Sequence, residues 1–214
     1  MAIVLSTPTV DRLRETVGVL REWQYDGAPF QLHPGDLGWC WRLGAETTAA
    51  AVGNWSRDGQ ILAIGFLDGS DLLRVTMAPG ARRDEELAQQ LVDDITEPES
   101  GVLPRGKVSV EAPADALVQD LFLEDGWKTD EPWTPLRRDL TEQVPDSGVR
   151  IEVVGPDQVH DRVAVQRASF DTSTFTDGRW HTMAAGLRQG DHCRRGGRTP
   201  GSRIVERRGL HPEL

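Results

Sequence analysis

Two glycine turns divide the centre of this chain into three strand-like runs, and this pattern allows little besides an antiparallel meander. Gly59 separates the first run from the second, and Asp68-Gly69 separates the second from the third. Short connections that contain glycine favour tight hairpin turns between antiparallel strands. The three runs are residues 48–55, 60–66 and 72–77.

A further run, residues 38–43, precedes the meander and contains Trp39 and Trp41 two positions apart. Residues spaced by two share one face of a strand, so we expect a strand with one aromatic face here. Such aromatic residues are core residues more often than they line an acceptor pocket or a dimer face.

Helical patterns flank these strands. Residues 8–22 and 83–95 place apolar side chains at helical spacing, and Pro113 precedes a third helical segment, residues 114–124. Residues 107–111 and 133–140 alternate as strands do. The sequence therefore predicts an α+β (mixed α/β) fold, in which a twisted, mostly antiparallel sheet has helices on both faces.

The second part of the chain repeats the beginning of the first. A polar linker, residues 141–149, is followed by a strand-like run, residues 150–154, and by a helix, residues 156–168. We expect a second copy of the fold to begin here, with residues 150–186 as its unfinished beginning. Residues 187–214 are rich in arginine and glycine and show no apolar period, so we expect an irregular tail, either truncated or read in a shifted frame.

Composition limits the classes of partner and the cellular compartment that we expect for this chain. The chain has 214 residues and a net charge of -10, which argues against a nucleic-acid or anionic-membrane surface. Cys40 and Cys193 are the two cysteines, too few for a disulfide framework, and no Cys/His spacing suggests a zinc site or another metal. We expect a cytoplasmic protein without a membrane span.

Two segments carry a family resemblance. Residues 72–79, Leu-Leu-Arg-Val-Thr-Met-Ala-Pro, are followed by an arginine and a helix, and this resembles the central motif of the GNAT superfamily of N-acetyltransferases. Residues 121–127, Leu-Phe-Leu-Glu-Asp-Gly-Trp, resemble the aliphatic-aromatic segment that precedes the last strands in that family. The resemblance implies one GNAT-like domain over residues 1–140 and a tandem protein with a second copy from residue 150.

The resemblance also implies acetyl-CoA as the cosubstrate. The family pattern Gln/Arg-x-x-Gly-x-Gly/Ala would place Arg82 at its first position, with Arg83 as a second cation for a phosphate. Val75 and Met77 would supply the strand backbone that pairs with the pantetheine arm. Free N–H groups and the positive end of the following helix suit a pyrophosphate.

The same pattern has lost its glycines. Glu85 and Leu87 stand where the family has Gly and Gly/Ala, and three successive carboxylates, those of residues 84–86, would repel a phosphate. The segment therefore also fits an ordinary helix with an acidic N-terminus, and this is the interpretation that we favour over an intact coenzyme site.

The catalytic residues are not identifiable from the sequence. Phe122 occupies the position where the family often has a tyrosine acid, and phenylalanine cannot donate a proton. Tyr25, the one tyrosine of the chain, lies elsewhere. Candidates for a general base are Glu46, Asp68 and Asp71, each of which is more simply a solvated carboxylate.

Two other groups of polar residues are candidates. His33 and Asp36 could form an acid/base pair, although a turn in which Asp36 binds backbone amides is the simpler interpretation. Residues 169–186 contain Arg179, Trp180 and His181, and they resemble the loop and helix beside the acceptor site of a complete second domain.

These patterns leave two hypotheses. In the first, the chain is a GNAT acetyltransferase relative that acts on a small-molecule or peptide amine, and its first copy is inactive or weakly active. In the second, it is a non-catalytic domain with the same fold, used for homodimerisation or for ligand binding.

Overall fold

The computed structural model describes residues 2–25, 28, 30–130, 141, 148–149, 152–188 and 209–212. The chain divides into two compact units, and each is assembled from separate stretches of sequence. The first unit comprises Met1–Pro34, Ala49–Arg138 and Ser202–Leu214, and the second comprises Gly35–Thr48 and Asp139–Gly201.

A mostly antiparallel open sheet organises the first unit. The strand order is β1-β2-β3-β4-β5-β7-β6, and β4 with β5 is the parallel pair. The meander predicted from the two glycine turns is confirmed as β2, β3 and β4. The strands are β1 (Val4–Ser6), β2 (Val52–Arg57), β3 (Gln60–Leu67), β4 (Leu72–Met77), β5 (Ser109–Glu111), β6 (Trp127–Thr129) and β7 (Gly209–Pro212).

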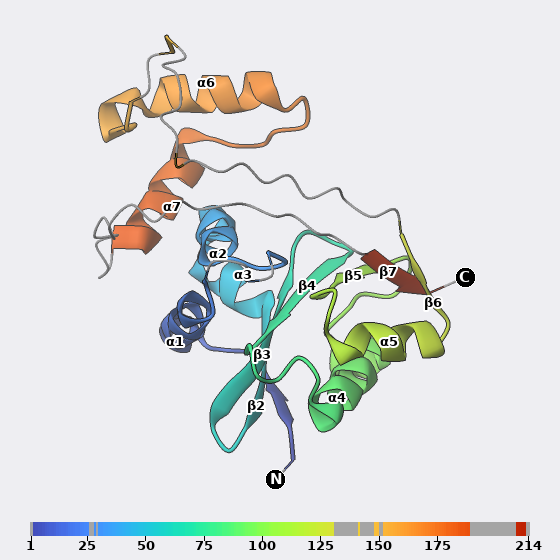
Figure 1. Ribbon diagram of the computed structural model, residues 1–214. Coiled ribbons are helices and arrows are strands. Elements are labelled where there is room, and N and C mark those ends of the chain that lie inside the picture. Colours follow the sequence, from blue (N-terminus) through green and yellow to red (C-terminus); the bar gives the residue numbers. More distant parts are fainter. Residues whose placement is uncertain are drawn as a thin grey trace. The chain divides into compact units, whose positions relative to one another are not determined.

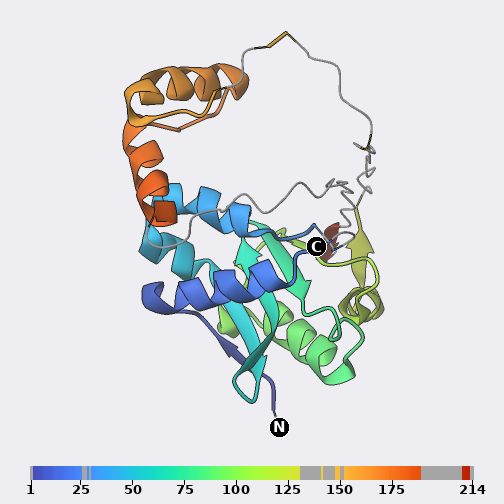
Figure 2. The ribbon, with the colours of Figure 1, turned by 60° about the vertical axis from the view of Figure 1, so that its left-hand side comes forward.

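Helices cover both faces of this sheet, as the sequence predicted (Figures 1 and 2). Helix α1 (Val10–Glu22) lies on one face, where Asn54 of β2 donates a buried hydrogen bond to the hydroxyl of Thr16 at 2.8 Å. Helices α4 (Glu85–Thr96) and α5 (Leu117–Glu124) lie on the other face. There, Trp55 of β2 donates from its indole nitrogen to Asp94 of α4 at 2.7 Å.

Trp55 is fully buried because its strand neighbours are small. It lies across Gly65, where an added Cβ would approach the indole ring to 2.9 Å. Gly53 lies directly opposite Gly65 in the strand register, and a Cβ there would also contact the ring. The two glycines therefore open the space that the indole fills, and the main apolar core is built around it.

Strands β4 and β5 are paired over only part of their length. Their register joins residues 72–74 to residues 109–111, and it ends at Arg74 and Glu111. Beyond this point Val75 to Met77 remain paired with β3 but not with β5. The two parallel strands thus part at the end that leads into the loop before α4.

The second unit is helical in its described part. A cluster formed by Val159, Val163, Phe175 and Trp180 joins its helices, and Trp39 stacks on Phe175 with ring centroids 5.1 Å apart. The helices are α2 (Pro34–Cys40), the 3₁₀ helix η1 (Trp41–Leu43), α3 (Ala45–Ala50), the 3₁₀ helix η3 (Pro156–Gln158), α6 (Val159–Ser169) and α7 (Asp177–Arg188).

The predicted strand over residues 38–43 is wrong, because α2 and η1 occupy this segment. Pro34 begins α2, and Gly44 ends η1 with φ of 105°. A first-turn proline and a glycine of positive φ are typical helix boundaries, and they outweigh the alternating tryptophans. Similarly, residues 48–50 belong to α3, and β2 begins at Val52.

The other predicted elements have mixed outcomes. The helices over 8–22, 83–95 and 156–168 are confirmed with small changes at their ends, whereas the helix expected from residue 114 begins at Leu117. Residues 152–154 form no strand, and the strand expected at 133–140 lies outside the described residues. In the tail, where no strand was expected, β7 pairs with β5 and β6. None of the described helices is long and apolar enough to cross a membrane.

Candidate functional site

The loop between β4 and α4 is the place where the sequence predicted an anion site. It consists of two successive tight turns, in which Ala81 N–H donates to Ala78 O at 2.8 Å and Asp84 N–H donates to Ala81 O at 3.2 Å. A Cβ added at Gly80 would meet no atom within 4 Å, so no close backbone contact requires a glycine at this position. The loop is therefore an ordinary connection and lacks the close, glycine-lined backbone that cradles a phosphate.

Asp84 occupies the N-terminus of α4. It is the N-cap residue, and its carboxylate accepts the backbone N–H of Leu87 at 2.9 Å. Arg57, the last residue of β2, donates to both Asp84 oxygens at 2.8 and 2.9 Å and also to Glu86 at 2.8 Å. A carboxylate thus already neutralises the helix end where a bound anion would lie.

This pairing changes the acidity of both partners. The hydrogen bonds from Arg57 hold the pKa of Asp84 below its ordinary value, although partial burial opposes the shift. The hydrogen bonds to Asp84 likewise raise the pKa of Arg57. The predicted acidic helix start is confirmed, and Asp84 and Glu86 are both paired with Arg57.

We expect Asp84→Ala to lower the free energy of unfolding by about 1–2 kcal/mol at neutral pH, because a cap and a paired carboxylate are both lost. The folded pKa of Asp84 lies below the unfolded one, so its contribution is fully present above the unfolded value. It is lost as the pH falls through the folded value. Urea unfolding between pH 7 and pH 3 should therefore show the two proteins converging in acid. Asp125→Asn, which removes an exposed carboxylate outside this network, is the control. A difference that stays constant with pH would contradict the assignment.

Arg82 is mostly buried and has partners from two parts of the first unit, Tyr25 and the segment at the start of α5. Its Nη1 donates to Asp115 at 2.8 Å, and its Nη2 donates to the hydroxyl of Tyr25 at 2.6 Å. Its carbonyl oxygen accepts the N–H of Leu117 at the start of α5 at 2.8 Å. Burial by itself would lower the pKa of Arg82, but the hydrogen bonds to Asp115 and Tyr25 outweigh it and raise the pKa.

Arg83 is more exposed but is also paired. Its Nη1 donates to Asp120 of α5 at 2.9 Å, and both side chains are more than half exposed. Together with Arg57 and Arg82, it completes a set of three arginines around the β4–α4 loop. Each of the three binds a carboxylate of the same chain.

The remaining residues of the predicted site are buried in the core. Val75 and Met77 are 1% and 3% exposed, and they lie on β4 beyond the point where β5 departs. Phe122 is fully buried and packs against Trp127 with ring centroids 4.7 Å apart. The position at which the resemblance would place a proton donor is therefore an apolar core position.

The candidate general bases predicted from the sequence lie in an ion pair, a local hydrogen bond and a helix start. Asp68 forms an ion pair with Arg74 at 2.8 Å, and Asp71 accepts a hydrogen bond from Ser70 at 3.3 Å. Glu46 lies in the first turn of α3. Asp36 lies in the first turn of α2, so a helix start replaces the predicted turn at this position.

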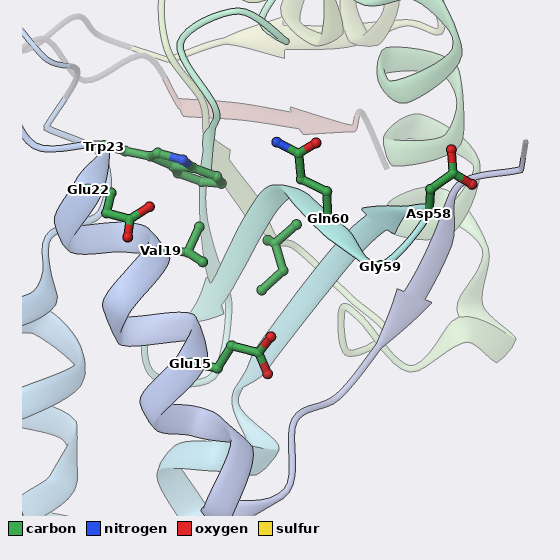
Figure 3. Close-up of a pocket in the computed structure, with 8 residues that line it drawn as sticks. Glu15, Val19, Glu22, Trp23, Asp58, Gly59 and Gln60 are labelled. Atoms are coloured by element: carbon green, nitrogen blue, oxygen red, sulfur yellow. The ribbon is translucent and has the colours of Figure 1, made fainter.

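An open depression of about 400 Å³ lies between α1 and the turn that joins β2 to β3 (Figure 3). Trp23 extends over it from the end of α1, and Glu15 and Glu22 come from the same helix. None of the four residues predicted to bind the coenzyme lines it. Its lining is Glu15, Val19, Glu22, Trp23, Asp58, Gly59, Gln60 and Ile61.

In the part of the chain that the structure describes, no three His, Cys, Asp or Glu side chains are grouped to hold a metal ion. No protein-family model matches the chain, and no curated protein matches it.

The sequence missed the partners of the three arginines. These partners, Tyr25, Asp84, Asp115 and Asp120, lie 27 to 57 positions away from the arginines that they bind. No local spacing relates residues so far apart. The one sequence signal was an excess of acidic residues next to arginines, and it did not specify the pairs.

Proposed function

We propose that the first unit is a non-catalytic relative of the GNAT acetyltransferases, whose coenzyme site is filled by its own carboxylates. The observation that carries the proposal is the pairing of Arg57, Arg82 and Arg83 with internal acids around the N-terminus of α4. In this position a coenzyme would require free cations and free backbone N–H groups.

The arrangement of elements supports the family part of the proposal. A helix follows the first strand, three antiparallel strands follow the helices, and a helix connects β4 to a parallel neighbour, β5. The parting of β4 and β5 after Arg74 would leave the backbone of Val75 and Met77 for the pantetheine arm in a family member that binds acetyl-CoA.

The side chains support the non-catalytic part. In the family's direct transfer, an amine attacks the thioester carbonyl, a base takes its proton, and an acid protonates the leaving thiolate. Phe122 has no proton to give, and its burial keeps it away from solvent and from any bound group. The phosphates would also meet Asp84, Glu85 and Glu86 at the helix start.

In this proposal the chain carries a non-catalytic first unit and the beginning of a second, GNAT-like copy near residue 150, and neither binds acetyl-CoA. The helices α6 and α7 would be part of that second copy. The low number of cysteines supports a reducing, cytoplasmic environment.

Calorimetric titration of the full chain with acetyl-CoA tests the proposal. We expect no saturable heat with acetyl-CoA up to about 1 mM. Titration to this concentration would detect a dissociation constant of about 1 mM, which corresponds to a binding free energy of about -4 kcal/mol. An active acetyltransferase titrated in parallel is the positive control. Saturable binding of acetyl-CoA by the full chain in the micromolar range, with desulfo-CoA as a competitor, would overturn the proposal.

A further inference from the structure

Strand β7 fills a place in the sheet between two strands that precede it by far in the sequence (Figure 1). Strands β5 and β6 each pair with β7, and they do not pair with each other. Leu210 of β7 is joined on one side to Val110 of β5 and on the other side to Thr129 of β6. We refer to the place between β5 and β6 as the strand slot.

The segment that fills the strand slot returns to the sheet from the second unit. The chain leaves the first unit after Arg138 and rejoins it at Ser202, so most of the second unit lies between β6 and β7 in the sequence. No hairpin ties β7 to either of its neighbours. A segment held by so long a connection has a lower effective concentration at its site than a strand held by a short turn.

The two strands that border the strand slot belong to the main core. Val110 of β5 is fully buried, and Trp127 of β6 is 6% exposed and packs against Phe122. Without an occupant, backbone N–H and C=O groups of both strands would lose their partners inside the sheet. Two unpaired strand edges would then face each other. The slot therefore requires a strand, and this requirement does not specify which copy of the chain supplies it.

We infer that the strand slot is an interaction site for a second copy of this chain, whose β7 it binds in the register seen here. Recognition is by strand addition, in which backbone hydrogen bonds carry the contact whether the strand comes from the same chain or from another. The exchange is reciprocal, because each copy gives its β7 and receives that of its partner, so both slots are filled in a closed dimer. The inference goes beyond the proposed function and does not depend on it.

The composition of β7 favours exchange over permanent insertion. Gly209 and Pro212 are poor strand residues, and Pro212 has no backbone N–H to donate. Only two residue pairs join β7 to β5, those of Gly209 and Leu210. The release of β7 from its own slot therefore breaks few backbone hydrogen bonds.

The test asks whether β7 of one copy enters the slot of another. Two versions of the full chain are made in a Cys40→Ala/Cys193→Ser background, one with Lys128→Cys and the other with His211→Cys. Positions 128 and 211 are register partners in β6 and β7. The Cα atoms of such partners lie about 4.5–5.5 Å apart, which a disulfide can span. The two proteins are mixed in equal amounts at about 1 mM, the scale of a tethered segment's effective concentration.

Oxidation with glutathione disulfide then traps the exchanged form. Non-reducing electrophoresis measures the covalent dimer, and mass spectrometry of the linked peptides identifies the mixed disulfide between positions 128 and 211. The matched control replaces Lys128→Cys by Asp93→Cys, an exposed position on α4 outside the strand slot. Circular dichroism melting verifies that every variant is folded.

We expect the mixed disulfide to form at least about fivefold more than in the control, with a yield that rises with protein concentration. A chain that carries both Lys128→Cys and His211→Cys, oxidised at about 10 μM, should form an internal disulfide and then give no mixed dimer. Equal yields from the folded slot and control mixtures would overturn the inference. A double variant without an internal disulfide would also overturn it, because β7 would then not occupy the slot. Neither result changes with acetyl-CoA binding, so failure here is distinguishable from failure of the proposed function.

Discussion

Replacement of Trp55 by alanine is expected to remove about 3–5 kcal/mol from the free energy of unfolding, since it empties the centre of a packed core. The side chain is fully buried between the sheet and α4, across Gly53 and Gly65. Few neighbouring atoms can move into the space, because the strand positions beside it have no side chains. Urea unfolding followed by far-ultraviolet circular dichroism measures the loss.

A matched variant separates packing from hydrogen bonding. Trp55→Phe keeps most of the apolar volume but removes the indole N–H that donates to Asp94, so we expect a loss of only about 1–2 kcal/mol. Should alanine and phenylalanine prove equally destabilising, the hydrogen bond and not the packed volume would dominate at this position.

Arg74→Met is expected to cost about 3–5 kcal/mol, because it removes a cation beside buried Glu111. The side chain of Arg74 is 13% exposed, and its Nε lies 3.7 Å from a Glu111 oxygen whose side chain is 6% exposed. Asp68 is the second carboxylate on this arginine, at 2.8 Å. Urea unfolding of the full chain again gives the change in free energy.

The double variant Arg74→Met/Glu111→Leu is the decisive comparison. Replacement of both members of a buried pair by apolar groups is often neutral, so the double variant should recover most of the stability lost by the single one. A double variant less stable than Arg74→Met would show that Glu111 stabilises the parallel strand pair independently of the arginine.

Much of the sheet could be predicted from the sequence because its signals are local. Gly59 and Asp68-Gly69 mark two hairpin turns, and the three runs that these turns separate correspond to β2, β3 and β4. Helix α4 could be predicted equally well, because its apolar residues share one face and acidic residues occupy its first turn.

Residues 38–43 show where local signals compete. Two tryptophans at a spacing of two suggested a strand, yet Pro34 and Gly44 bound a helical segment. A short apolar run has no periodicity strong enough to decide between the two structures, and the boundary residues determine the outcome. The rings of Trp39 and Phe175 then stack, a contact between residues that no sequence pattern relates.

The candidate site, too, could be predicted from the sequence only in part. The loss of glycines at Glu85 and Leu87 and the absence of a hydroxyl at Phe122 were visible in the sequence. The pairing of Arg82 with Asp115 was not, because it depends on the loop after β4 lying beside the loop before α5 in the folded chain. Whether arginines are available to a ligand is a property of the tertiary structure.

The interleaved make-up of the two units has a practical meaning for anyone who wishes to divide this chain. Gly35–Thr48 belongs with Asp139–Gly201 and not with the sheet on either side of it in sequence. A fragment that ends in the polar stretch at 141–149 would therefore retain Trp39 while losing the ring of Phe175 on which it stacks. Its exposed indole would make such a fragment prone to self-association, so an apparent dimer of the fragment would say little about the intact protein.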